Sequence, residues 1–524
     1  MPTRSVLVRI TGTPFSLNDL RPDTRLATIA ARLRAAGHET TILDFATRTT
    51  FESLYPEHLR DQAATSARAH GGRHTASFDL EDGASTPIQL PKPLADHQTE
   101  VWEAIGEKIA ARRDFDFVLL SMAKPKDVTA TAAVVKRVRA MMPRMTIAAC
   151  GSVFDADPDL ISKALKWYDA VCLGTDATWL AGLAENLGSP KALRSIPNVA
   201  YLDGARFVVT PPDRSDHGTE AASPSFDLDV YPSLALNEKI HLFDLDETVA
   251  VAGPEGTSAT YLKPPETLLK EIQTLTISRA FHLRGCLPQS DHTAIIARAL
   301  LSRNIRIQYS REANISAMDP ATISAMSASG LTGVDVRIDT GSQRLLDTHY
   351  EHPFCVTDVE EAMRRSKISS LFTAMRFRYP IPEDDHHTRA ETLRIIERCN
   401  PHSALIELPR SAHESAHRGL LFQEFRPFAN RARKRAEEEN RVLRSEVQEL
   451  GVPLDIPARV AFLAALSDFH GREVEFVDTM RRDLLHGDVG TIAARIERIN
   501  EKAAAPAKTF QLKPFSPMQD AVAN

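Results

Sequence analysis

Residues 331–347 read LTGVDVRIDTGSQRLLD and carry the strongest fold signal in this 524-residue chain. On both sides of it, segments typical of strands alternate with helical ones. Alternation of this kind predicts parallel strands joined by helices, with the chemistry at the strand ends.

The flanking segments extend this pattern. SRAFHLRGC (278–286) and IRIQYSREA (305–313) are typical of strands, and a helical stretch follows each of them. AMRFRYP (374–380) leads through the loop PEDDHH (382–387) into another helix. We therefore predict a partial (β/α) barrel of TIM type over residues 233–410, with its active face at the carboxyl ends of the strands.

The N-terminal residues 1–212 show the same alternation in a separate α/β unit. Its strands read VLVRI, TTILDFA, DFDFVLLSMA and MTIAACG, and amphipathic helical stretches connect them. This predicts a doubly wound, Rossmann-like parallel sheet whose ligand lies beyond the carboxyl ends of the strands. Four strand ends would form that rim: 11–14, 121–126, 150–154 and 174–176.

The rest of the chain completes the domain organisation. Residues 213–232 are rich in Pro, Ser and Asp and predict a linker. Residues 411–505 favour helices with mixed charge, and residues 506–524 form an extended tail. A cap over the barrel mouth and a dimerisation surface explain the helical region equally well.

Composition narrows the class of protein. The chain is 43% hydrophobic and 25% charged, as in soluble globular proteins. A net charge of -6 offers no basic excess for nucleic acid, and neither a membrane span nor a secretory signal is evident. We expect a cytoplasmic protein. The five cysteines are scattered, and no pair has CxxC spacing, so buried thiols are expected.

The N-terminal motifs resemble the cobalamin-binding domain that precedes the barrel in many cobalamin (B12)-binding radical S-adenosylmethionine (SAM) enzymes. AARLRAAGHETTILD (30–44), DFDFVLLS (114–121) and IPNVAYLDG (196–204) match family segments in the family order. The barrel stretch 331–347 resembles the family's glycine-serine turn, and PPETLLKEI (264–272) resembles another landmark. The resemblance covers roughly residues 5 to 410.

The resemblance implies cobalamin at the strand-end rim. The family's paired glycines are Cys150 and Gly151 here, and its GEgE motif reads GTDA. No Asp-x-His-x-x-Gly motif occurs, which implies base-off cobalamin without a protein histidine. A Rossmann-like domain that has lost its ligand stays open as an alternative. The residues implied for cobalamin are Thr11, Ser121, Met122, Lys124, Gly151, Ser152, Val153, Gly174 and Thr175.

The family's iron-sulfur loop is replaced in this chain. Three thiolates would hold a four-iron cluster in that loop, but the corresponding positions fall on or close to Val251, Glu255 and Ser258. The chain is therefore a degenerate member by resemblance, with no cluster expected. Without the cluster, no electron reaches the sulfonium of SAM, and the family's radical chemistry is not expected.

A SAM-like pocket is implied on the barrel. Asp339 and Thr340 stand where the family has Glu-Ser beside the SAM ribose, and Arg311 matches a position that often faces SAM. The residues implied for this pocket are Arg311, Asp339, Thr340, Ser342 and Pro382. Whether SAM itself binds is left open.

Other candidate residues have ordinary explanations. Glu255 is a candidate acid or base, or a surface carboxylate. His386 and His387 cannot both point one way, so we expect an aspartate-capped helix entry rather than a metal site. His282 is expected to be a satisfied strand histidine. No catalytic residue is assigned.

Several functions follow from these observations. One is cobalamin-dependent, cluster-independent chemistry on a small metabolite, such as polar methyl transfer from SAM, with a partner enzyme or reductase supplying electrons. A second version keeps cobalamin and uses the old SAM pocket for substrate. The alternative class is a non-catalytic corrinoid-binding or scaffold protein that partners another enzyme. An ordinary radical-SAM enzyme would need three thiolates gathered from the five scattered cysteines.

Overall fold

The computed structural model divides the chain into two compact units, one reaching Ser278 and one beginning at Arg279. We call them the N-terminal unit and the C-terminal unit. The predicted domain boundaries at residues 212, 232, 410 and 505 stay predictions. The structure describes residues 3–463 apart from 13–16, 60–91, 124, 152, 155–160, 162–163, 174–181, 184–192, 205, 212–223, 236–237, 253–257, 276–277, 286–289, 351, 382 and 409–421.

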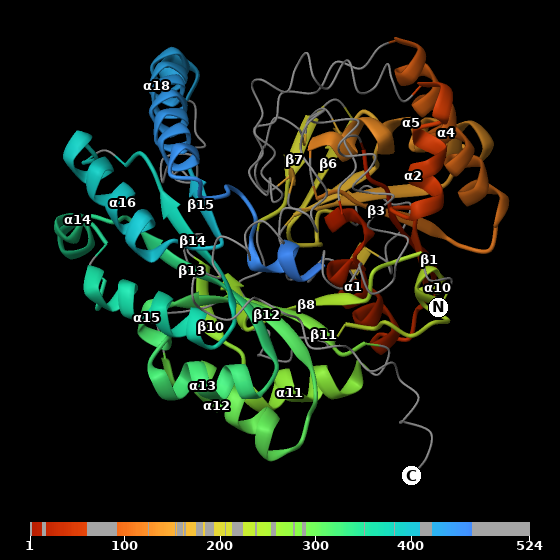
Figure 1. Ribbon diagram of the computed structural model, residues 1–524. Coiled ribbons are helices and arrows are strands. Elements are labelled where there is room, and N and C mark those ends of the chain that lie inside the picture. The colour runs from red at the N-terminus through yellow and green to blue at the C-terminus, as the bar shows by residue number, and fades with distance from the viewer. Residues whose placement is uncertain are drawn as a thin grey trace. The chain divides into compact units, whose positions relative to one another are not determined.

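The described strands at the start of the N-terminal unit form one sheet in the order β2-β1-β3-β4-β5-β6-β7 (Figure 1). β1 to β5 are parallel, as predicted, and β6 and β7 extend the sheet as antiparallel strands. The chain leaves β1 on one side and returns to β3 on the other, so the topological switch point lies between β1 and β3. The strands are β1 (Arg4–Arg9), β2 (Glu39–Asp44), β3 (Phe117–Ser121), β4 (Thr146–Cys150), β5 (Ala170–Cys172), β6 (Val199–Asp203) and β7 (Arg206–Val209).

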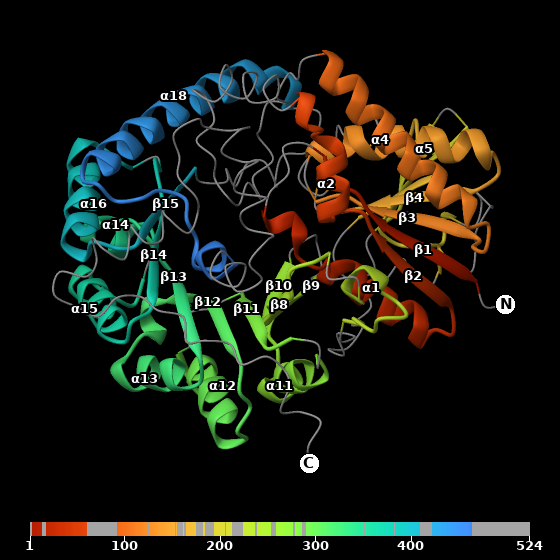
Figure 2. The same cartoon turned by 45° about the vertical axis from the view of Figure 1, so that its right-hand side comes forward.

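Helices connect these strands. α1 begins at Asp23, whose carboxylate accepts a hydrogen bond from the Leu26 amide, and ends before Gly37, whose φ of +83° suits glycine. α4 and α5 lie side by side (Figure 2). The helices are α1 (Thr24–Ala35), α2 (Arg48–Leu54), α4 (Lys92–Ala111), α5 (Pro125–Met141), α10 (Pro232–Ala235) and α11 (Pro265–Thr274), with 3-10 turns η1 (Leu17–Leu20) and η2 (Glu57–Leu59).

The C-terminal unit contains parallel strands that pair in chain order from β11 to β15. Their apolar side chains are fully buried, for example Val336 and Phe377. This order confirms the predicted strand and helix alternation of the partial barrel. The strands are β11 (Ala280–Arg284), β12 (Gln308–Asn314), β13 (Leu331–Asp339), β14 (Phe372–Arg378) and β15 (Ser403–Glu407).

The connecting helices of this unit lie along one face of that sheet (Figure 2). α13 begins at Asp319 and α16 at Asp385, and both carboxylates cap their helices as N-cap residues. The predicted capping role of the EDDHH loop is thereby confirmed. The elements are α12 (Ser290–Ser302), α13 (Pro320–Ala328), α14 (Gln343–Thr348), α15 (Val356–Ile368), α16 (His386–Cys399), α18 (Phe422–Glu449) and the 3-10 turn η4 (Ile315–Ala317).

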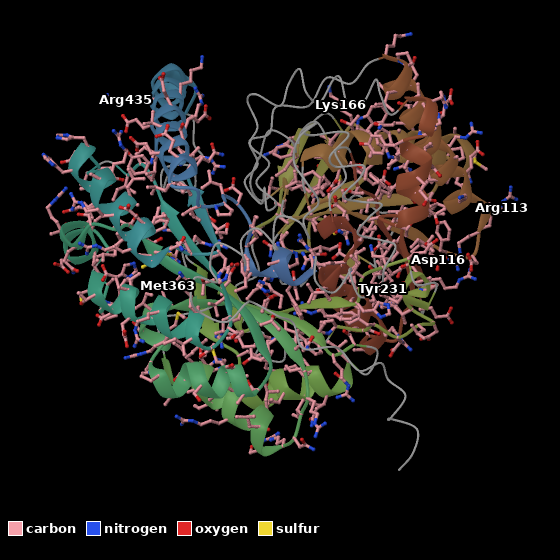
Figure 3. The ribbon with its side chains drawn as sticks, in the orientation of Figure 1. Arg113, Asp116, Lys166, Tyr231, Met363 and Arg435 are labelled. Atoms are coloured by element: carbon pink, nitrogen blue, oxygen red, sulfur yellow. The ribbon has the colours of Figure 1, made fainter. Side chains whose placement is uncertain are left out.

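Met363 of α15 is fully buried, whereas Arg435 of α18 is exposed (Figure 3).

The segment after α18 returns to the sheet. Beyond α18, the Asp455 amide donates to the Ala404 carbonyl and the Ala458 amide donates to Asp335 of β13 at 2.6 Å. Residues 452–463 therefore line β15 and reach the strand face that carries Asp335. In the part of the chain that the structure describes, no helix is long and apolar enough to cross a membrane.

Candidate functional site

Charged side chains gather on β12 to β15. Arg376 of β14 lies 3.0 Å from Glu407 of β15, 3.7 Å from Asp335 in the middle of β13, and 4.0 Å from Glu312 of β12. We call these four residues the Arg376 cluster. Its side chains are 2 to 35% exposed, so these strands present charge at the predicted active face.

The face that carries this cluster points away from the connecting helices. Arg311 of β12 donates to Thr293 of α12 at 2.8 Å, and Tyr309 contacts Ser329 after α13 at 2.8 Å. Side chains alternate along a strand, so Ser310 and Glu312 point the other way. The Arg376 cluster therefore lies on the inner face of the partial barrel.

A second ionic group, which we call the Asp339 cluster, lies at the end of β13. The Asp339 carboxylate accepts from Arg337 Nε at 3.1 and 3.2 Å, forms an ion pair with Arg378 Nε at 3.2 Å and contacts His352 Nε2 at 3.0 Å. Asp339 is 1% exposed, while the two arginine side chains are 45% and 39% exposed. The buried carboxylate thus holds two half-exposed guanidinium groups.

The backbone helps to place this carboxylate. Asp339 has a φ of +70°, and the pairing of β13 with β14 shifts register between Arg337 and Asp339. Such a conformation is uncommon for a residue with a side chain. Burial alone would raise the pKa of Asp339, but the His352 hydrogen bond and the two arginine charges outweigh it and lower that pKa.

Aromatic rings enclose His352. Its ring stacks on Tyr350, with centroids 5.4 Å apart, and on Phe354, with centroids 4.7 Å apart. The Tyr350 hydroxyl is buried and has no hydrogen-bond partner among the described residues. Burial, followed by the charge of Asp339, raises the pKa of Tyr350. The hydroxyl therefore stays protonated and can donate to a ligand.

The predicted SAM-like pocket is brought together only in part. Asp339, Thr340 and Ser342 lie in one turn, where the Ser342 amide donates to Thr340 at 3.2 Å. The Ser342 hydroxyl is fully buried and has no partner in the described part of the chain. Arg311 lies apart from this turn, beneath α12, and Pro382 lies outside the described residues.

Glycine is required in this turn by close approach. A Cβ on Gly341 would lie 2.5 Å from the Cα of Thr392 in α16, and the Gly341 amide donates to the Thr392 hydroxyl at 3.0 Å. The glycine-serine turn is thus packed directly on α16.

His282 is buried, and its Nδ1 lies 2.8 Å from the Ser310 hydroxyl, which confirms the expected satisfied strand histidine.

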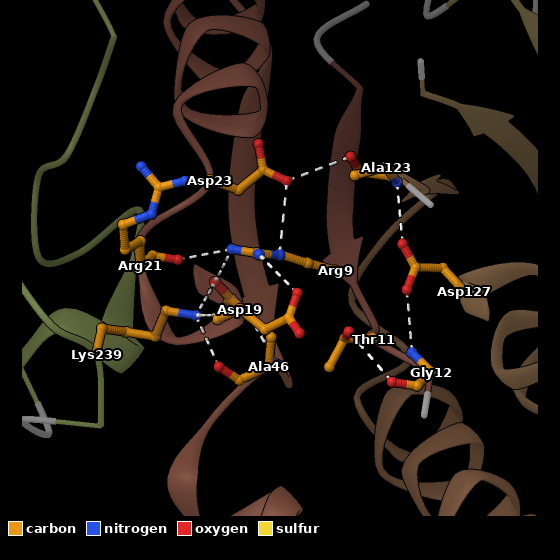
Figure 4. A network of polar contacts seen from close by, with 12 residues as sticks. Arg9, Thr11, Gly12, Asp19, Arg21, Asp23, Ala46, Ala123, Asp127 and Lys239 are labelled. Carbon is orange, nitrogen blue, oxygen red and sulfur yellow. Dashed lines mark hydrogen bonds and ion pairs between the residues drawn. The ribbon is translucent and has the colours of Figure 1, made fainter. Parts of the chain in front are cut away.

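The N-terminal unit has its own strand-end network at the switch point. Asp127, in the first turn of α5, accepts from the Gly12 amide at 3.0 Å and from the Ala123 amide at 3.1 Å (Figure 4). Gly12 follows β1 and Ala123 follows β3. A carboxylate of the protein itself therefore accepts hydrogen bonds from the amides that, in related folds, face anionic ligands.

A buried ionic network lies beside these contacts of Asp127 (Figure 4). Lys239 Nζ lies 2.7 Å from Asp44, and Arg9 lies 3.6 Å from the same carboxylate, which also accepts from the Tyr231 hydroxyl. Lys239 also donates to the Ala46 carbonyl at 2.8 Å. Burial lowers the pKa of Lys239 to about 8, although Asp44 opposes that shift.

The pKa of Arg9 shifts in the opposite direction to that of Lys239. Burial disfavours its charge, but Asp44, Asp23 and other nearby groups outweigh burial and raise the pKa of Arg9. Lys239 and Asp44 are each 0% exposed. The network is closed to solvent and binds the segment around Lys239 to the ends of β1 and β2.

The described members of the predicted cobalamin rim are all buried. Ser121 donates to Asp23 at 3.3 Å, and the sulfur of Met122 accepts from Thr131 at 3.1 Å. A Cβ on Gly151 would lie 1.7 Å from the Met122 carbonyl oxygen. These buried residues thus support the strand ends from inside the unit, and we call them the strand-end frame. Thr11 and Val153 are also buried, and Lys124, Ser152, Gly174 and Thr175 lie outside the described residues.

Two antiparallel strands form in the segment where the sequence resemblance predicted a replaced cysteine loop. β9 (Thr248–Ala252) and β10 (Ser258–Leu262) pair antiparallel after β8 (Leu242–Asp246). Val251 lies in β9 opposite Ala259, and Ser258 begins β10 opposite Ala252. Glu255 lies outside the described residues. Two of the three expected thiolate positions are therefore strand residues.

The sequence prediction missed most of the ionic residues of the C-terminal unit. Arg337, Arg376, Arg378 and His352 were not among the predicted site residues. A signal was present, since VDVRID and AMRFRYP alternate charged and apolar residues inside predicted strands. Among the described residues, no group of three His, Cys, Asp or Glu side chains could hold a metal ion.

Comparison with known proteins gives a match in fold only. No family model and no curated protein matches the sequence. The radical S-adenosylmethionine methyltransferase TsrM from Kitasatospora setae, with tryptophan substrate and a SAM analogue bound, is 14% identical with a TM-score of 0.54. That match covers 77% of this chain and 73% of TsrM.

Two further structures are similar. TsrM with cobalamin and a [4Fe-4S] cluster bound is 13% identical, with a TM-score of 0.53, over 78% of this chain and 75% of that one. The cobalamin-dependent S-adenosylmethionine radical enzyme OxsB, with aqua-cobalamin and SAM bound, is 11% identical with a TM-score of 0.51. It covers 88% of this chain, which spans 58% of OxsB. The predicted α/β fold, a Rossmann-like unit followed by a TIM-type barrel unit, is confirmed.

Proposed function

We propose that this protein is an enzyme that uses cobalamin and SAM to methylate a small metabolite by a polar route without an iron-sulfur cluster. Its fold likeness to TsrM and OxsB, whose structures hold cobalamin, supports the choice of cofactors. The proposed absence of an iron-sulfur cluster is supported by the β9–β10 hairpin, because Val251 and Ser258 stand where the family resemblance expects thiolates.

The proposed reaction is balanced without a radical. The bond between the methyl carbon and the sulfur of SAM breaks heterolytically, a nucleophilic atom of the metabolite gains the methyl group, and a proton leaves. The products are S-adenosylhomocysteine and the methylated metabolite, with no net oxidation. Bound cobalamin would supply a cobalt centre able to carry a methyl group between the two molecules. A partner reductase is assigned the task of keeping the cobalt reduced.

Residues of the C-terminal unit fit a polar ligand. The hydroxyls of Ser342 and Tyr350 are both buried without a partner among the described residues, and buried hydroxyls normally have one. We assign them to polar atoms of SAM. The Asp339 carboxylate is already bound by Arg337, Arg378 and His352, so it positions the turn.

The N-terminal unit fits a corrinoid through its strand-end frame. None of the four rim segments 11–14, 121–126, 150–154 and 174–176 contains a histidine, so we propose base-off cobalamin without a protein ligand to cobalt. The described rim side chains are buried, and their role is to hold the loops in place. No described residue is assigned as a general acid or base.

One observation favours a second candidate, a non-catalytic scaffold that partners another enzyme. Asp127 already accepts from the Gly12 and Ala123 amides at the switch point, which are the groups that a ligand there would use. A scaffold would bind neither cofactor and would turn over no substrate.

The test uses full-length protein purified without added metal. Hydroxocobalamin is titrated in and followed by absorbance, and the complex is then incubated with a reductant, metabolite pools and SAM that carries a deuterated methyl group. We expect stoichiometric cobalamin binding and labelled product with S-adenosylhomocysteine. Formation of 5′-deoxyadenosine would contradict the polar route, and absence of both binding and labelling would leave the scaffold.

A further inference from the structure

We infer that Arg337 and Arg378 form a binding site for the carboxylate or phosphate group of a small molecule. Arg378 is the last residue of β14, and Arg337 lies two residues before the end of the neighbouring strand β13, at the predicted active face. Their Nε atoms each lie 3.2 Å from the same oxygen of Asp339, so the guanidinium groups are neighbours. A pair of adjacent guanidinium groups is the arrangement that recognises planar or tetrahedral oxyanions.

The unused donors are the first argument. An arginine has five N–H groups. The Nε–H of Arg337 donates to Asp339, and Nε is also the atom of Arg378 that lies nearest to that carboxylate, at 3.2 Å. Among the described residues, the structure gives the terminal amino groups of Arg337 and Arg378 no protein partner. The side chains are 45% and 39% exposed, so these donors are open to a ligand.

Charge balance is the second argument. The two arginines share one carboxylate, Asp339, so the three residues together carry one positive charge. Arg376, the next arginine inward, lies within 4.0 Å of three carboxylates and has no such excess. Of these three arginines, only Arg337 and Arg378 therefore outnumber the carboxylates with which they form ion pairs.

Preorganisation is the third argument. Asp339 is 1% exposed and also contacts His352, whose ring is stacked between Tyr350 and Phe354. This support fixes the carboxylate, and the carboxylate fixes both guanidinium groups before a ligand arrives. Side chains held in this way lose less conformational entropy on binding. The Tyr350 hydroxyl, buried beside this cluster without a described partner, adds a donor.

The same molecule offers a matched pair for comparison. Arg364 and Arg365 also share one carboxylate, Glu361, at 2.7 Å each, but on the outer helix α15. Glu361 is 37% exposed and lies within the helix itself. A pair of this kind is an ordinary surface ion pair. It provides the control for the pair at the active face.

This inference names a feature of the substrate or cosubstrate in the proposed function, but it can be tested apart from it. Full-length protein, without cobalamin or SAM, is titrated with inorganic phosphate by calorimetry at low ionic strength. We expect Arg337→Gln and Arg378→Gln each to weaken phosphate binding at least about tenfold, as loss of a charge-assisted hydrogen bond does. The double variant Arg364→Gln/Arg365→Gln should bind phosphate as the native protein does.

A second measurement needs no variant. Phenylglyoxal modifies accessible arginines, and mass spectrometry locates the modified residues. Phosphate should protect Arg337 and Arg378 from modification while leaving Arg364 and Arg365 reactive. Native protein that binds no phosphate, or protection that does not distinguish the two pairs, would overturn the inference. Failure of this kind would leave the methyl-transfer proposal intact, since the assay contains neither cofactor.

The source of the anionic group is identified by competition. Saturating S-adenosylhomocysteine carries the same carboxylate as SAM. If it raises the apparent dissociation constant of phosphate, the site takes the carboxylate of SAM. If phosphate binds equally well in its presence, the site takes the carboxylate or phosphate of the methyl acceptor. Both results support an oxyanion site and differ only in its occupant.

Discussion

Asp44 in the N-terminal unit and Asp339 in the C-terminal unit are both buried carboxylates that hold two cations, but the cations differ in their exposure to solvent. Asp44 binds Lys239 and Arg9, and Lys239 is 0% exposed. Asp339 binds Arg337 and Arg378, which are 45% and 39% exposed. A closed network has no donor left for a ligand and acts on stability, whereas an open one keeps donors for binding. The comparison assigns the first cluster to folding and the second to recognition.

The largest expected effect comes from breaking the closed network. Asp44→Asn leaves Lys239 buried without its counter-ion and weakens the contact to Tyr231. We expect the free energy of unfolding to fall by about 3–5 kcal/mol, as when one partner of a buried pair is removed. Urea denaturation followed by circular dichroism measures it. The control Asp227→Asn removes an exposed partner of Arg34 and should change stability by less than about 0.5 kcal/mol.

The next effect tests how tightly the strand ends beside that network are packed. Gly151→Ala places a Cβ 1.7 Å from the Met122 carbonyl oxygen at a φ of +144°. We expect a loss of about 3 kcal/mol, from overpacking and backbone strain together. Gly204→Ala, at a φ of +63° with open space around it, should lose only about 1 kcal/mol. Equal losses in the two variants would mean that Met122 can move aside.

A smaller effect is expected at the open cluster, and it depends on pH. The lowered pKa of Asp339 means that its ionic contacts stabilise the fold above the ordinary value of 3.8 and are lost as the pH falls below it. Asp339→Asn should therefore cost about 2 kcal/mol at pH 7, and the difference from the native protein should shrink below about pH 4. Chemical denaturation at several pH values checks this. A difference that stays constant down to pH 3 would argue against ionic stabilisation.

The smallest stability effect separates recognition from folding. Arg337→Gln/Arg378→Gln removes two half-exposed cations, so the free energy of unfolding should fall by less than about 1 kcal/mol while phosphate binding is lost. Thermal and urea unfolding of the double variant supply the first value. A loss as large as that of Asp44→Asn would make the second cluster structural, and the comparison would fail.

Strands, helices and caps could be predicted because they depend on local patterns. Asp385 caps α16 as the EDDHH segment suggested, and the 331–347 stretch forms β13, the turn and α14. The orientation of Arg311 could not be predicted. Both faces of a barrel strand are buried, so apolar pattern does not tell which set of alternate residues meets the helices. Its contact with Thr293 fixes that choice only in the folded chain.

The ionic clusters could not be predicted from the sequence for a related reason. Arg337 and Arg378 lie 41 positions apart and become neighbours only through the pairing of β13 with β14 and the register shift at Asp339. Lys239 likewise meets Asp44 through tertiary packing alone. The absence of CxxC spacing was evident from the sequence, whereas the pairing of β9 with β10, where the resemblance expected thiolates, was seen only in the folded chain.

Iron and sulfide analysis tests the central claim, that this fold works without an iron-sulfur cluster. Full-length protein is incubated anaerobically with iron, sulfide and a thiol reductant, desalted, and analysed for both elements together with bound cobalamin. We predict cobalamin binding with iron and sulfide well below one per chain. About four iron and four sulfide per chain, the content of a [4Fe-4S] cluster, would contradict the claim and restore radical chemistry.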